Sequence, residues 1–209
     1  MKVLPALVPA AVAALLAAGC GSSGSKHSAS QPRATAASSA STTTTSGSGP
    51  GALQAEAKSA ATGDIPDNQA FVVFADPAAG YSMKYPEGWA QSGGGKHVVI
   101  RDKNNIIRVV VTPGTVPTGA AVRRQLEAVR SLHVVQGPQP SSLPSGRAVK
   151  VVYSTRSTPN PVTGKRVTLV VDRYYVAHGG KLAVVDLGTP QGVDNVDAYR
   201  LMIQSFRWR

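Results

Sequence analysis

A long tract of small residues confines folding to the second part of this chain. From Gly21 to about Asn68 the sequence is dominated by Ser, Thr, Ala and Gly, and it holds almost no large apolar side chain. Such a tract cannot bury enough surface to offset the entropy that ordering costs, so we predict that residues 20–69 form a disordered tether. The apolar runs that a core needs begin after it, and residues 70–209 have the length of one ordinary domain.

The segment before the tether has the layout of a secretory signal. Lys2 supplies a positive start, Val3 to Ala18 is almost wholly apolar, and small residues follow. A membrane-spanning helix needs about 20 apolar residues, whereas this run is shorter and is interrupted by two prolines. We therefore predict that residues 1–19 are a signal peptide and treat a permanent membrane span as the weaker interpretation.

The residues Ala17-Ala18-Gly19-Cys20 resemble the lipobox of bacterial lipoproteins, although leucine is usual where Ala17 stands. The resemblance implies that the Cys20 thiol receives a diacylglyceryl group, that the preceding peptide bond is cut, and that the new N-terminus is acylated, for instance with palmitate. Because Cys20 is the only cysteine, it cannot form an intramolecular disulfide. Two or more acyl chains hold a protein stably, so we expect a lipid anchor in the cell membrane, on its extracytoplasmic face. The alternative is an ordinary signal peptide that happens to contain a cysteine.

The chain is strongly basic, with 22 Lys and Arg against 11 Asp and Glu and a net charge of +11. Most of the excess lies in residues 70–209, where it favours anionic partners. The basic residues are scattered, which fits either a solvating surface or a binding face. The export signal and the lack of a nucleic-acid-binding motif argue against nucleic acid. The expected partners, besides the membrane, are an envelope protein or an anionic wall polymer.

Short apolar runs separated by turn residues predict a strand-rich domain. Strands are expected over residues 71–75, 81–85, 97–102, 106–111, 133–136, 149–155, 166–177 and 181–187. Helical spacing of apolar residues predicts helices over 118–132 and 194–206. Because short turns join successive strands, we expect an antiparallel sheet with both helices covering one face, which is an α+β fold.

Each predicted helix has one apolar face. In the first helix, Thr118 is the expected N-cap, and Val122, Leu126 and Val129 recur at helical spacing. In the second helix, the corresponding face comprises Val196, Tyr199, Ile203 and Phe206.

The stretch Gly80 to Trp89, GYSMKYPEGW, resembles the opening of PsbP-like domains, in which a hairpin strand ends in Tyr-Pro and a tryptophan follows. The mid-chain helix, the long late hairpin and the closing helix are similar too, so the resemblance covers residues 70–209. It implies a compact sheet flanked by helices. Bacterial lipoproteins with such domains mostly lack an assigned activity, and the photosystem II role of the photosynthetic relative is not carried over, because none of its metal-associated residues matches a position here.

No catalytic or metal-binding motif stands out. The loop from Gly93 to His97 lacks the Ser or Thr that must follow the lysine of a phosphate-binding loop, and no G-x-S-x-G elbow occurs in residues 70–209. The four histidines are far apart and lack ligand spacing. We therefore expect no enzyme activity, no cofactor and no metal. A small-ligand carrier and a cell-wall-modifying enzyme with an unrecognised site stay open as alternatives.

Aromatic residues provide the only candidate partner contacts. Tyr85 and Trp89 either form an edge that grips a peptide or glycan, or close one end of the core. Tyr174 and Tyr175 are neighbours on a predicted strand, so they should face opposite sides, one buried and one exposed.

Overall fold

A computed structural model describes residues 62–129, 131–160 and 164–209 of the chain. The predicted signal peptide, Cys20 and most of the predicted tether lie outside the described residues. The fold and the cavity below therefore concern the domain that follows them.

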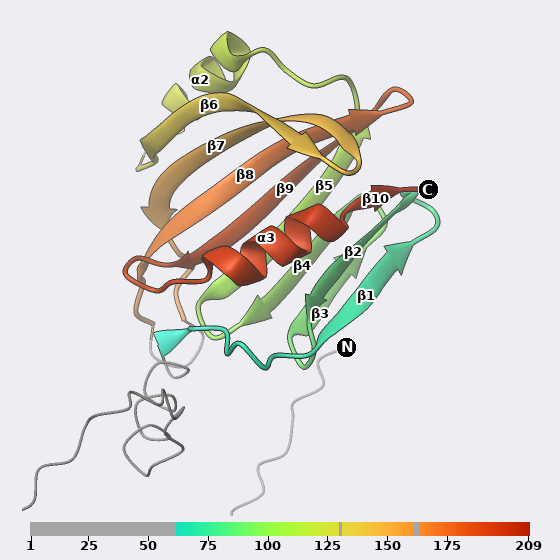
Figure 1. Cartoon of the computed structure of the whole chain (residues 1–209). Coiled ribbons are helices and arrows are strands. Elements are labelled where there is room, and N and C mark those ends of the chain that lie inside the picture. Colours follow the sequence, from blue (N-terminus) through green and yellow to red (C-terminus); the bar gives the residue numbers. More distant parts are fainter. Residues whose placement is uncertain (1–61, 130, 161–163) are drawn as a thin grey trace, which may run out of the picture. The chain divides into compact units, whose positions relative to one another are not determined.

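The described strands form two antiparallel sheets (Figure 1). The small sheet has the order β1-β2-β10, with β1 at Phe71–Asp76, β2 at Tyr81–Pro86 and β10 at Arg207–Trp208. The large sheet has the order β3-β4-β5-β9-β8-β7-β6. Its strands are β3 (Ala90–Gly94), β4 (His97–Asp102), β5 (Asn105–Pro113), β6 (His133–Leu143), β7 (Gly146–Arg156), β8 (Thr168–His178) and β9 (Lys181–Pro190). The helices are α2 (Gly119–Glu127) and α3 (Val196–Ser205).

Every predicted strand is present, but the sequence did not reveal β3 or β10. All five residues of β3 are exposed, so no apolar alternation marks it. The predicted single sheet is wrong as well, because β1 and β2 pair with β10 instead of joining the large sheet. Strand β6 extends past the predicted end at residue 136 despite its two prolines. It lies at the edge of the large sheet, where a missing backbone N–H is tolerated.

The two helices cover opposite faces of the large sheet, which corrects the expectation that both cover one face. On β5, Ile107 and Val109 point into the core below α3, whereas Ile106 packs in the cluster that contains α2. Both faces of the sheet therefore carry apolar side chains, and each face needs its own cover. Figure 1 shows α3 lying across the front of the sheet beside the small sheet.

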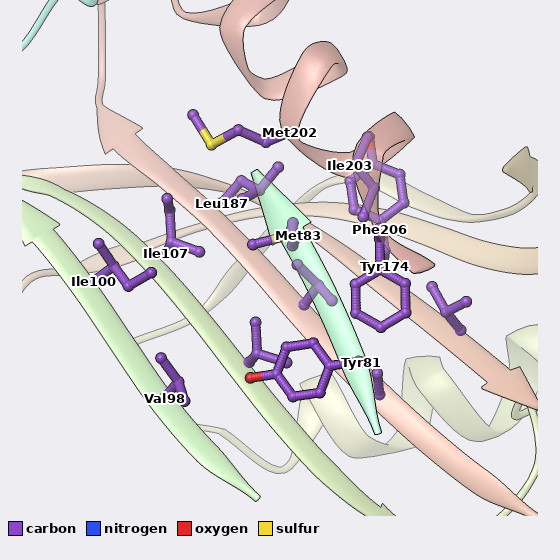
Figure 2. Close-up of a cluster of buried hydrophobic side chains, with 14 of the residues drawn as sticks. Tyr81, Met83, Val98, Ile100, Ile107, Tyr174, Leu187, Met202, Ile203 and Phe206 are labelled. Atoms are coloured by element: carbon purple, nitrogen blue, oxygen red, sulfur yellow. The ribbon is translucent and has the colours of Figure 1, made fainter. Parts of the chain in front are cut away.

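The larger core lies between α3, the small sheet and the large sheet. Figure 2 shows Tyr81 of β2 and Phe206 after α3 within this cluster, and their rings stack with centroids 5.6 Å apart. Phe206 in turn makes an edge contact with Trp208, 5.4 Å between centroids. Burying each such side chain contributes roughly 1.5–3 kcal/mol. These contacts fasten the small sheet and the C-terminal residues to the rest of the domain.

The smaller core lies under α2. Thr118 caps this helix as predicted, because its Oγ1 accepts the Ala121 N–H at 3.2 Å. Val122 and Leu126 are buried, but α2 ends at Glu127 and leaves Val129 50 % exposed. The prediction that Val129 belongs to the buried face is therefore wrong, because the helix stops before reaching it.

Two further details differ from the sequence predictions. Tyr174 and Tyr175 do face opposite cores, but both are buried, since each face of the sheet is covered. Val196 is 60 % exposed, because α3 begins at this residue and turns it away from the core, whereas Tyr199 and Ile203 are buried.

The packed domain begins before the boundary predicted between residues 69 and 70. Ile65 belongs to the larger core, and its N–H donates to the Asn195 Oδ1 at 2.8 Å. The side-chain amides of Asn105 and Asn195 donate to the Gly63 carbonyl at 2.6 and 3.1 Å. These buried polar contacts place residues 63–65 within the fold, a role that their composition did not indicate.

Candidate functional site

A cavity of about 470 Å³ lies on the α2 face of the large sheet. Val129 and Leu132, which follow α2, form part of its wall, and the chain from Thr155 to Asn160 forms another part. The volume falls within the range of sites that hold small ligands. We call this feature the basic cavity, because of the side chains that line it.

A row of three charged side chains crosses the floor of the basic cavity. Asp186 on β9 is the cross-strand neighbour of both Arg108 on β5 and Arg173 on β8. Arg173 donates from Nε at 2.6 Å and from Nη2 at 2.9 Å to the two carboxylate oxygens of Asp186, and Arg108 donates from Nε at 2.9 Å and also from Nη2. The Asp186 side chain is only 4 % exposed, so it requires this positive surrounding. Two guanidinium groups on one carboxylate leave the row with a net positive charge.

Tyr153 extends this charged row. The Arg173 Nη2 donates to the Tyr153 Oη at 3.0 Å, and the guanidinium lies 5.0 Å from the centre of the Tyr153 ring. Burial raises the pKa of Tyr153 to about 12, so the phenol keeps its proton at neutral pH. Although burial alone would lower the pKa of Arg173, the hydrogen bonds to Asp186 raise it, which keeps the guanidinium charged. The floor thus presents two cations and a neutral O–H group.

An apolar row lies next to the charged row. Ile106 on β5 and Val171 on β8 are the cross-strand neighbours of Gly188 on β9, and both line the cavity. A Cβ atom at Gly188 would lie 2.8 Å from the Ile106 Cγ2 and 3.2 Å from the Val171 Cγ2, which shows how closely these two side chains approach over the glycine. Leu169 continues the apolar surface along β8.

Further cations stand around this apolar floor. Arg101 on β4 is exposed and pairs across the sheet with Ile106, and its Nη1 donates to the Thr158 Oγ1 at 3.1 Å. The basic residues among the lining side chains are Arg101, Lys103, Arg108, Arg156 and Arg173. Among the described lining residues, Asp186 is the one carboxylate. This excess of positive charge around a concave surface attracts anions.

The lining residues offer little for acid–base or nucleophilic catalysis. Among the described residues, the lining includes no His, Cys or Glu, and Asp186 is engaged by two arginines. The Ser157 hydroxyl donates to the Thr158 carbonyl and accepts the Val167 N–H. Within the described part of the chain, no group of three or more His, Cys, Asp or Glu side chains is placed to hold a metal ion. The arrangement is suited to holding an anion.

The residues proposed from the sequence lie elsewhere. Trp89 is 8 % exposed and belongs to the larger core, and Tyr85 is half-buried against the same core. Neither lines the basic cavity. Cys20 lies outside the described residues. Searching ranges 62–129, 131–160 and 164–209, we find no helix both long and apolar enough to cross a membrane.

Sequence reasoning missed the basic cavity, although a local signal exists. Arg108 interrupts the run IIRVVV, and Asp186 interrupts AVVDLG. A charged residue inside an apolar strand must find a partner or face solvent. Such interruptions therefore mark where a strand face becomes polar, but they do not reveal which strands meet there.

Comparisons with known proteins bear on the fold. No family model and no curated protein matches the chain. The solved structure of cyanobacterial PsbP (CyanoP) from Synechocystis matches with a TM-score of 0.50 at 16 % identity, over 70 % of this chain and 98 % of that chain.

Two weaker likenesses add nothing to the fold assignment. The Ran-binding protein Mog1p from Saccharomyces cerevisiae has a TM-score of 0.43 at 12 % identity, over 68 % of this chain and 96 % of that chain. LpqN of Mycobacterium tuberculosis, described as involved in cell envelope biogenesis, has a TM-score of 0.36 at 13 % identity, over 69 % of this chain and 87 % of that chain. Two antiparallel sheets with helices on both faces of the larger one, together with the match to cyanobacterial PsbP, give the described part of this chain a PsbP-like α+β fold.

Proposed function

We propose that this chain is a lipid-anchored lipoprotein on the extracytoplasmic face of the cell membrane, and that its PsbP-like domain binds an anionic component of the envelope without catalysing a reaction. The lipobox-like residues before Cys20 support the anchor. The basic cavity supports the binding role and is the observation that carries it, because it gathers five cations around one carboxylate in a space of ligand size.

Binding is favoured over catalysis by the state of the polar groups in the cavity. A general base needs a free lone pair within reach of the substrate. The Asp186 oxygens accept hydrogen bonds from Arg108 and Arg173, and the part of the lining that the structure describes contains no histidine. A wall-modifying enzyme would require such a base, so this alternative has less support.

A small-ligand carrier is the second candidate function. The half-buried apolar side chains of Ile106 and Leu132 on the cavity wall favour it, since a site that binds charge alone does not need an apolar surface. In this case the cavity would hold a whole small molecule, whereas in the first case it would hold one group of a larger envelope partner.

The test compares binding of the full chain to isolated cell envelopes with that of two variants. Arg108→Gln removes the accessible cation of the charged row, and Lys84→Gln removes an exposed cation that does not line the cavity. We expect binding that weakens as salt rises, that drops at least tenfold in Arg108→Gln, and that stays unchanged in Lys84→Gln. Equal loss in both variants would show a general charge effect and would contradict a site at the cavity.

A further inference from the structure

We propose that the ligand of the basic cavity is an amphiphilic anion, a molecule in which one phosphate or carboxylate group is joined to an apolar chain or ring. The proposal rests on the proposed role of the cavity as an anion site. It specifies the remainder of the ligand, which the charge of the cavity does not determine.

Arg108 is the residue that meets the anionic group. Its side chain is 40 % exposed, whereas those of Arg173 and Asp186 are 18 % and 4 % exposed. Because both arginines share the same carboxylate, Arg108 retains positive charge toward the cavity. Guanidinium groups form strong, charge-assisted hydrogen bonds with phosphate and carboxylate oxygens.

Tyr153 adds a second donor next to Arg108 and Arg173. Its oxygen accepts a hydrogen bond from Arg173, so its own proton is left for another acceptor. A neutral O–H donor beside a guanidinium can donate to an oxyanion, whereas the positive guanidinium would repel a cation. The charged row and Tyr153 therefore form the subsite for the anionic group.

The apolar row fixes the chemistry of the rest of the ligand. Ile106 and Val171 lie one step along the sheet from Arg108 and Arg173, and they close over Gly188. Leu169 continues this surface, and Leu132 faces the cavity from the α2 side. Val171 and Leu169 are almost fully buried, so the apolar surface open to a ligand comes from the half-buried Ile106 and Leu132. A polyanion would leave these two side chains against its own hydration water. An apolar chain or ring attached to the anionic group would cover them instead.

The outer cations are less suited to anchoring a ligand. Arg101 is held by Thr158 at 3.1 Å, and Lys103 lies 3.7 Å from the Asp102 carboxylate. Both residues are exposed at the rim, where salt screens their charge. Their contribution is to attract the anion toward the cavity, whereas Arg108 binds it.

Isothermal titration calorimetry of the full chain with three probes tests the proposal. Octyl phosphate carries both parts of the proposed ligand, octyl glucoside carries the chain without the charge, and inorganic phosphate carries the charge without the chain. We expect octyl phosphate to bind at least tenfold more tightly than either partial probe.

Two variants test which residue binds the anionic group. Arg108→Gln should weaken the binding of octyl phosphate at least tenfold, and the exposed control Lys84→Gln should leave it unchanged. Because Arg108 supports a buried carboxylate, circular dichroism confirms folding, and Arg101→Gln at the exposed rim gives a second variant with a smaller expected loss.

The outcomes separate this proposal from the proposed function. If octyl glucoside or inorganic phosphate binds as tightly as octyl phosphate, the ligand is not an amphiphilic anion. If inorganic phosphate binds through Arg108 and the octyl chain adds nothing, the amphiphile is excluded while the anion site stands. If no anionic probe binds and envelope binding is also insensitive to Arg108→Gln, both proposals fail.

If octyl phosphate binds, a competition experiment identifies the source of the ligand. Displacement of bound octyl phosphate by phosphatidylglycerol vesicles identifies a membrane lipid, and lack of displacement identifies a free amphiphile. Both results support the proposal.

Discussion

At the scale of single residues, Asp186 determines what the basic cavity can hold. Without this carboxylate, Arg108 and Arg173 would be like charges on the two strands that flank β9. With it, the row is tied together and keeps one net positive charge. Asp186 thus holds the two guanidinium groups side by side on the floor of the basic cavity, where we propose that an anion binds.

Replacing Asp186 by Asn should destabilise the fold by about 3 kcal/mol, because it leaves two partly buried guanidinium groups without a counter-charge. Urea unfolding measures this cost. Asp172→Asn is the matched control: Asp172 pairs with Lys150 at 2.6 Å, but it is more exposed, so the loss there should be about 1 kcal/mol or less. Equal losses at the two positions would show that Asp186 does not act as a buried counter-charge for the two arginines.

Tyr153 predicts how stability changes at alkaline pH. Burial raises its pKa to about 12 in the folded chain, against the ordinary value of 10.0. Below pH 10 both states are protonated and its contribution is fully present. Between about pH 10 and 12 the unfolded chain loses the proton while the folded chain keeps it, so stability falls as pH rises, by about 2–3 kcal/mol for this group.

Tyr153→Phe removes this titrating group and should flatten part of the alkaline loss. Chemical denaturation of wild type and variant at several pH values from 9 to 12 measures the difference, in which the other buried tyrosines cancel. If the two proteins lose stability in parallel over this range, Tyr153 is not buried as described.

At the scale of elements, the close contact of three strands shapes the floor of the cavity. Gly188 lets Ile106 and Val171 approach over β9. Gly188→Ala places a methyl group 2.8 Å from the Ile106 Cγ2 and should cost about 1–3 kcal/mol through overpacking. Gly94→Ala is the control, since a Cβ there meets nothing within 4 Å. Thermal unfolding of both variants measures the destabilisation. An unchanged Tm for Gly188→Ala would show that Ile106 and Val171 can move apart without loss of stability, which would contradict the close packing described here.

Local patterns predicted the elements well and their arrangement less well. Strands such as β5 were found because residues 106–111 are apolar except for Arg108, and this signal does not depend on what covers the strand. The placement of α2 and α3 on opposite faces was missed, since the sequence shows that β5 is apolar on both sides but not which helix covers each side. Strand β3 was missed because all of its residues, AQSGG, are exposed, so the sequence shows no alternation of apolar and polar side chains there.

The candidate site was harder to predict than the fold. Arg108 and Asp186 are 78 residues apart in sequence, and only the pairing of β5 with β9 brings them together. The sequence shows that both charged residues interrupt apolar runs. It does not show the strand order that brings the two residues together, because that order is set only in the folded sheet. Tyr85 and Trp89 drew attention as aromatic residues, and the structure places them against the larger core.

At the scale of the whole molecule, we propose that a lipid anchor at Cys20 keeps the binding domain at the membrane. Full-length protein made in a bacterium that processes lipoproteins should incorporate labelled palmitate and sediment with membranes. Cys20→Ala should lose the label, because it lacks the thiol that the diacylglyceryl group requires. Ser22→Ala is the matched control and should keep it. Equal labelling of the Cys20→Ala variant would contradict the anchor.

Photocrosslinking in living cells tests the central claim most directly, because it asks which surface of the domain meets the ligand. A benzophenone amino acid is placed at Val129, an exposed valine on the cavity wall, or at Val73, an exposed valine on the small sheet away from the cavity. We predict an adduct from position 129 that disappears when Arg108→Gln is added, and no such adduct from position 73. An adduct from position 73 alone, or one from position 129 that is indifferent to Arg108, would contradict binding in the basic cavity.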